Sequence, residues 1–136
     1  MRRIYASPEG SVANEDYCGK VEVGTVTRIG IINCAKKARQ CVGVNCFSSF
    51  YKKSDAFAGY SDCVIVGFAH CNECCASTIE PIRERAQSLA KAGAEKIHIS
   101  SCIKAICPNY NEFIKTLSPD FAIVGYTHAI PAQKRS

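Results

Sequence analysis

The chain has 136 residues, of which 47% are hydrophobic, and carries a formal net charge of +5. This length corresponds to about one domain, which can bury a core without disulfides or other staples. No apolar run reaches the roughly 18 residues of a membrane-spanning helix, and the N-terminus has no secretory-signal pattern, so we expect a cytoplasmic protein without a membrane partner. The basic residues are scattered, which favours a solvated surface over a nucleic-acid interface.

Residues 1–27 mix Pro, Gly, Ser and charges without periodicity and are predicted to form an N-terminal extension or edge element. From residue 28 onward, short apolar and β-branched runs predict strands, and apolar positions three and four apart predict helices. The predicted strands are 28–32, 62–68, 96–100 and 121–126, and the predicted helices are 44–53, 78–93 and 111–117. The clearest helix, 78–93, has a capping box formed by Ser77 and Glu80 and a C-terminal stop at Gly93.

Strands that alternate with helices indicate crossover connections and a parallel sheet. The strands are continuously apolar, which is typical of a sheet covered on both faces. We therefore predict an α/β fold, a three-layer sandwich with a mainly parallel sheet of four or five strands, flavodoxin-like or Rossmann-like. The domain is expected to span residues 28–128, and residues 129–136 are expected to form a tail.

The chain contains ten cysteines. In a reducing compartment this number favours metal or redox chemistry over a disulfide framework. Each predicted strand is followed, within about three residues, by a thiol or an imidazole, and the carboxyl ends of parallel strands share one edge, where ligands bind. These residues are Cys34 beside Asn33, then His70, Cys71, Cys74 and Cys75, then Cys102 with Cys107 beyond it, and finally Thr127 and His128.

Other cysteines and histidines have simpler interpretations. Cys63 and His98 lie inside predicted strands, so we expect a small core residue and a satisfied or surface-facing histidine. Cys41 and Cys46 lie in the segment after the first strand, where they could fold over the same edge or only pack.

The stretch "CNEC", residues 71–74, is a Cys-x-x-Cys pair ahead of a predicted helix. Two thiolates at this spacing form half of a tetrahedral zinc site, or half of an iron–sulfur ligand set. The same arrangement also serves as a redox dithiol. A phosphatase-like cysteine loop is disfavoured, because Arg39 follows Cys34 by five residues rather than six and the loop has no glycine run.

These motifs carry a family resemblance. The pieces "IGIINC", "CVGVNCF", "VGFAHCNEC", "SSCI", the Cys-Pro at 107–108 and "YTH" follow one another as they do in the CGGC-domain family, which this chain resembles over residues 28–128. The resemblance implies a metal-binding protein, with zinc as the usual suggestion, whose biochemical role is poorly defined. Asn72 and Glu73 stand where the family has its two central glycines, and side chains there hinder close approach of the backbone to a bound group.

We therefore predict a metal-binding protein whose partner is a metal ion and whose cofactor is zinc, with an iron–sulfur cluster or a Cys71/Cys74 redox dithiol as alternatives. Eight candidates exceed the four ligands of one tetrahedral zinc, which leaves spectators, two sites or a cluster open. The first-ranked ligands are Cys34, Cys71, Cys74, Cys102 and His128; Cys41, Cys46 and Cys107, also matched to the family motifs, rank second.

Overall fold

Strands and helices alternate along the chain, as the sequence predicts. The computed structural model describes residues 26–71 and 79–129. The strands are β1 (Thr27–Asn33), β2 (Cys63–His70), β3 (Lys96–Ile99) and β4 (Ile123–Val124). The α-helices are α1 (Val44–Lys52), α2 (Glu80–Lys91), α3 (Ser101–Ile106) and α4 (Tyr110–Leu117), and two single-turn 3-10 helices are η3 (Lys37–Arg39) and η4 (Asp55–Phe57).

Two elements differ from the prediction. Helix α3 was not expected, because its six residues are too few to show a helical period. Strand β4 covers only two residues of the predicted run 121–126. No helix within the described part of the chain is long and apolar enough to cross a membrane.

The described strands form one parallel sheet in the order β2-β1-β3-β4. This confirms the predicted parallel sheet and its strand number, and the order is that of the first four strands of a flavodoxin-like sheet. The flavodoxin-like or Rossmann-like type itself stays a prediction. The chain runs from β1 to β2 on one side and then from β2 back across to β3 on the other side of β1. The carboxyl ends of β1 and β3 therefore flank the switch point, where open α/β sheets bind ligands.

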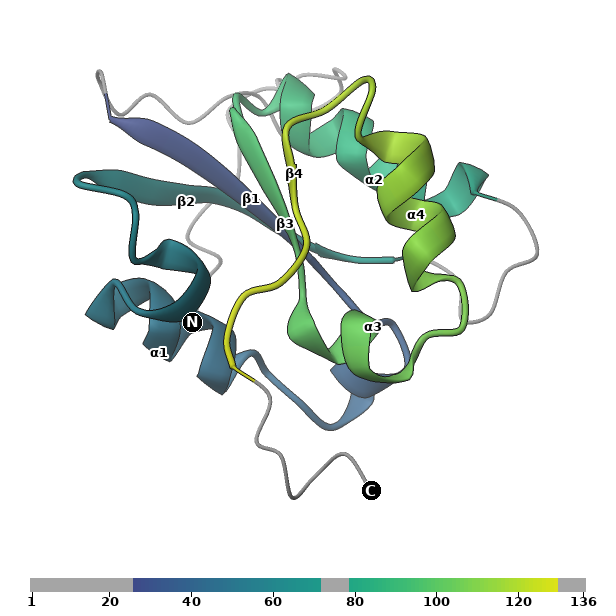
Figure 1. Cartoon of the computed structure of the whole chain (residues 1–136), viewed down its shortest axis with the longest axis horizontal. Helices are drawn as coiled ribbons and strands as arrows, with labels where there is room; N and C mark the ends of the chain where they lie inside the picture. The colour runs from purple at the N-terminus through teal and green to yellow at the C-terminus, as the bar shows by residue number, and fades with distance from the viewer. Residues whose placement is uncertain (1–25, 72–78, 130–136) are drawn as a thin grey trace, which may run out of the picture.

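Helices cover both faces of this sheet, as the predicted three-layer sandwich requires (Figure 1). On one face, Phe50 of α1 and Phe57 of η4 pack on Ile29 and Ile31 of β1. On the other face, side chains of α2, α3 and α4 form a second apolar cluster with Ile32. Successive residues of β1 therefore point to opposite faces, because side chains alternate along a strand.

Two glycines allow α2 to approach the sheet closely. Gly30 and Gly67 are paired across β1 and β2, next to a register shift in that ladder. A Cβ atom would lie 3.0 Å from Leu89 Cδ1 at Gly30 and 2.4 Å from Leu89 Cδ2 at Gly67. A contact of 2.4 Å is shorter than real Cβ atoms show, and one of 3.0 Å is unusually tight, so the missing side chains at Gly30 and Gly67 leave the space that Leu89 occupies in the core.

Helix α2 begins at Glu80 with Ile79 as its N-cap residue. Ser77 of the predicted capping box lies outside the described residues, so that prediction stays untested. At the other end, Gly93 has a φ of +110° and donates its N–H to Ala90 O at 3.0 Å. This left-handed conformation suits glycine, and it confirms the predicted end of the helix.

His98 is fully buried in the middle of β3. Its Nδ1 lies 2.9 Å from Tyr126 O, its Nε2 lies 2.8 Å from Tyr60 Oη, and its ring stacks on Phe57 with centroids 4.5 Å apart. Burial lowers the pKa of His98 from 6.5 to about 4. Of the two alternatives predicted for His98, the satisfied histidine is confirmed and the surface-facing one is not, and Cys63 is buried as predicted.

Candidate functional site

The ends of β1 and β2 bring two cysteines together. Cys71 donates its backbone N–H to Asn33 O at 2.9 Å, which continues the β1–β2 ladder past its last pair. The N–H of Ala35 in turn donates to Cys71 Sγ at 3.3 Å. Cys34 and Cys71 are 6% and 8% exposed and belong to the same apolar cluster. Strand ends that are far apart in the chain therefore place two thiols in one buried environment.

Two further cysteines follow β3 on the same side of the sheet. Cys102 lies in α3, and Cys107 follows its last residue and donates its backbone N–H to Ile103 O at 2.9 Å. Both side chains are partly buried and pack against the cluster that contains Cys34 and Cys71. Cys102 Sγ also lies 2.9 Å from Ser100 Oγ.

Burial raises the pKa of the Cys71 thiol, and the hydrogen bond from the Ala35 amide acts in the opposite direction. The nearby thiols of Cys34 and Cys107 raise this pKa further, because neighbouring thiolates would repel each other. Cys71 is therefore a protonated thiol at neutral pH. A cation at this point would displace the proton and relieve the repulsion.

Cys46 lies at the same edge but on the α1 side of the sheet. Its Sγ is 3.2 Å from Thr127 Oγ1. Burial raises the pKa of Cys46, the Thr127 hydroxyl lowers it, and the thiols of Cys102 and Cys41 raise it. Cys41 is exposed, and its sulfur accepts the N–H of Gly43 at 3.3 Å. Cys102 therefore neighbours the thiols on both sides of the sheet.

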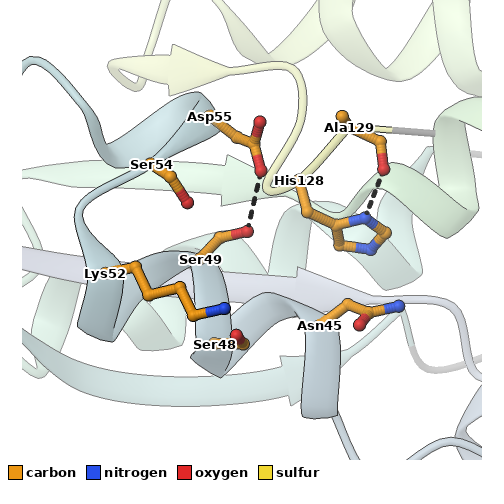
Figure 2. A pocket seen from close by; sticks show the side chains of 8 residues that line it. All are labelled: Asn45, Ser48, Ser49, Lys52, Ser54, Asp55, His128 and Ala129. Carbon is orange, nitrogen blue, oxygen red and sulfur yellow. Dashed lines mark hydrogen bonds between the residues drawn. The ribbon is translucent and has the colours of Figure 1, made fainter. Parts of the chain in front are cut away.

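Ser101 fixes the backbone that carries His128. Its hydroxyl donates to His128 O at 2.5 Å and accepts the N–H groups of Thr127 at 3.1 Å and His128 at 3.0 Å. The imidazole, however, lines a polar cavity beside α1, and its Nδ1 lies 2.9 Å from Ala129 O (Figure 2). None of the described residues that line that cavity is a cysteine. The fold thus brings the backbone of His128 to the sheet edge, while its ring points into a different environment.

Asn33 is a polar residue of the edge whose burial could not be read from the sequence. It is 5% exposed, and its Oδ1 has no hydrogen-bond partner in the described structure. Leaving a buried acceptor unpaired costs about 1–3 kcal/mol. Ser100 and Ser101 were also missed, since a serine after a strand gives no distinctive signal, yet both are fully buried here.

The seven described cysteines are all free thiols. Over residues 26–71 and 79–129, no group of three or more His, Cys, Asp or Glu side chains is arranged to hold a metal ion. Cys74 and Cys75 lie outside these ranges. The predicted ligand set therefore stays a prediction, although four of its cysteines share one apolar cluster.

Comparison with known proteins agrees with the motifs. No curated protein and no solved structure matches the chain. The family model described as CGGC domain matches residues 28–128, from the second residue of β1 to the residue after Thr127. In this chain the central motif reads Cys71-Asn72-Glu73-Cys74. Because the match covers well over half of the chain, the protein belongs to the CGGC domain family.

Proposed function

We propose that this protein binds a zinc ion through cysteines at the carboxyl edge of its parallel sheet. One observation carries the proposal: Cys34 and Cys71 share a buried cluster at neighbouring strand ends, and Cys107 is close enough to influence Cys71. Membership of a family with this cysteine pattern supports it. Soft thiolates are ligands that zinc prefers.

Cysteine is a residue type that zinc prefers, and the described cysteines would supply part of the ligand set. Cys34, Cys71 and Cys102 would be ligands from the ends of β1, β2 and β3. Cys74, three residues after Cys71, would complete a tetrahedral set from the Cys-x-x-Cys pair. Cys107, Cys41, Cys46 and His128 are the remaining candidates.

The surroundings of Cys71 suit a ligand better than a nucleophile. The Ala35 amide points at its sulfur, which stabilises a thiolate once a cation is present. Without a cation, burial keeps the pKa of Cys71 raised. A reactive redox cysteine needs the opposite, a lowered pKa and access to a partner. This weighs against the thiol–disulfide alternative for the Cys71/Cys74 pair.

An iron–sulfur cluster is the second candidate, because the four cysteines of one apolar cluster, together with Cys46 near Cys102, exceed the four ligands that one zinc needs. Anaerobic purification followed by metal analysis and a visible spectrum separates the two. A colourless protein with about one zinc per chain supports the proposal. A brown protein with iron and acid-labile sulfide supports the cluster.

Two matched cysteine variants test the site. Cys71→Ser should remove most of the bound zinc, because a hydroxyl is a poor ligand for a soft ion. Cys63→Ser should retain it, since Cys63 packs in the α1-side cluster at the beginning of β2. Circular dichroism of both proteins checks that each is folded. Equal zinc content in the two folded variants would remove the basis of the proposed site.

A further inference from the structure

A polar cavity of about 260 Å³ opens beside α1, and neither Cys34 nor Cys71 is among the described residues that line it. Figure 2 shows the side chains that line the cavity. Its walls come from α1, from the start of η4 and from His128 and Ala129 after β4. The sequence positions that meet here are more than seventy residues apart, so only the fold creates this space.

The polar side chains of α1 gather on the flank that faces this cavity. Asn45, Ser48 and Lys52 recur at spacings of three and four, so they form one stripe along the helix. Asn45 and Lys52 are exposed and Ser48 is partly exposed, so this stripe lines the cavity and can be reached from solvent.

Most polar groups in the cavity are unpaired within the described structure. Asn45, Ser48, Lys52 and Ser54 make no side-chain hydrogen bond or ion pair there. Asn45, Ser48 and Ser54 can each donate a hydrogen bond and are neutral, and Lys52 carries a positive charge. Figure 2 shows the Lys52 side chain extended along the wall that α1 forms.

The opposite part of the cavity provides acceptors. The Asp55 carboxylate accepts the Ser49 hydroxyl at 3.0 Å and keeps free lone pairs. Asp55 has a φ of +52°, a left-handed conformation that is strained for a non-glycine residue and that occurs often at functional sites. His128 Nδ1 donates to Ala129 O at 2.9 Å, and in that tautomer Nε2 can accept a hydrogen bond.

We propose that this cavity binds a small hydroxylated anion. Its anionic group, a carboxylate or a phosphate ester, lies against Lys52 and the donors of Asn45 and Ser48. Its hydroxyl groups donate to Asp55 and His128. Asp55 is the one carboxylate among the described lining residues and already accepts the Ser49 hydroxyl, so the excess of unpaired donors favours an anion. The volume suits a molecule of a few carbons and not a nucleotide.

Binding is measured by calorimetry with glycerol 3-phosphate, glycerate, inorganic phosphate and glycerol as probes. Glycerol 3-phosphate or glycerate is expected to bind at millimolar concentration, and the stronger of the two identifies the anionic group. Glycerol lacks the anionic group and inorganic phosphate lacks the hydroxylated carbon chain, so each should bind more weakly. The titration is run with and without a chelator, which separates this site from the proposed zinc site.

Lys52→Ala is the decisive variant, and Lys115→Ala on α4 is its matched control, because both lysines are exposed. Loss of a hydrogen bond from a charged donor should weaken binding by roughly tenfold or more in Lys52→Ala. Lys115→Ala should leave the dissociation constant within about twofold of the parent. No binding of either hydroxylated anion to the parent protein, or equal weakening in the two variants, would overturn the proposal.

Discussion

The buried histidine of β3 makes the stability of this protein depend on pH. His98 is fully buried, with Tyr126 O on its Nδ1, Tyr60 Oη on its Nε2 and Phe57 against its ring. The Tyr126 carbonyl accepts a hydrogen bond from Nδ1–H, so Nε2 of the neutral ring accepts the hydrogen bond of the Tyr60 hydroxyl. Protonation therefore places a charge in the core and removes the acceptor of that hydroxyl.

The pKa of His98 is about 4 in the folded chain and 6.5 in the unfolded chain, so the unfolded state binds a proton first as pH falls. The stabilisation is fully present above about pH 6.5 and is lost as pH falls toward 4. The difference of about 2.5 between the two pKa values corresponds to roughly 3 kcal/mol. About 2 kcal/mol of this is lost between about pH 7.5 and about pH 5.

Urea unfolding at these two pH values, with a reductant and a chelator present, measures the effect without a contribution from bound metal. His98→Gln should abolish most of the fall in unfolding free energy between the two pH values, although it lowers stability at both. His128→Gln, which changes a partly exposed histidine, should keep the fall. A His98→Gln protein that loses as much stability as the parent protein would refute the reasoning.

Two further substitutions test the packing and the edge of the sheet. Gly67→Ala should lower the unfolding free energy by about 1–3 kcal/mol, because its Cβ would overlap Leu89. Gly59→Ala should be nearly neutral in the same urea assay, because a Cβ added there would meet nothing within 4 Å. Asn33→Leu should leave the metal-free protein as stable as the parent or more stable, because it removes a buried acceptor that has no partner in the described structure. A loss above about 2 kcal/mol would show that the Asn33 side chain is satisfied in solution.

The arrangement of layers could be predicted because long apolar runs and clear helical periods do not depend on distant contacts. β1, β2 and α2 fall at or within a few residues of their predicted positions. The six residues of α3 carry too little periodicity to be recognised, and β4 pairs over only two residues because just Ile123 and Val124 align with β3.

The candidate site, too, could be predicted from the sequence only in part. Strand ends determine where the backbone of a residue lies, and Cys34 and Cys71 accordingly share one cluster. They do not determine where a side chain points. Ser101 holds the backbone of His128 at the edge, but the ring turns toward α1. Asn33 illustrates the same limit, because burial of its amide depends on neighbours from several elements.

X-ray absorption at the zinc edge of the anaerobically purified protein tests the central claim most directly, since it reports the atoms bound to the metal. Our account predicts bound zinc with a shell dominated by sulfur at about 2.3 Å. Cys71→Ser should reduce the zinc signal, and Cys63→Ser should leave both the signal and the shell unchanged. A shell made only of nitrogen and oxygen at about 2.0–2.1 Å, or no zinc in the purified protein, would contradict the claim.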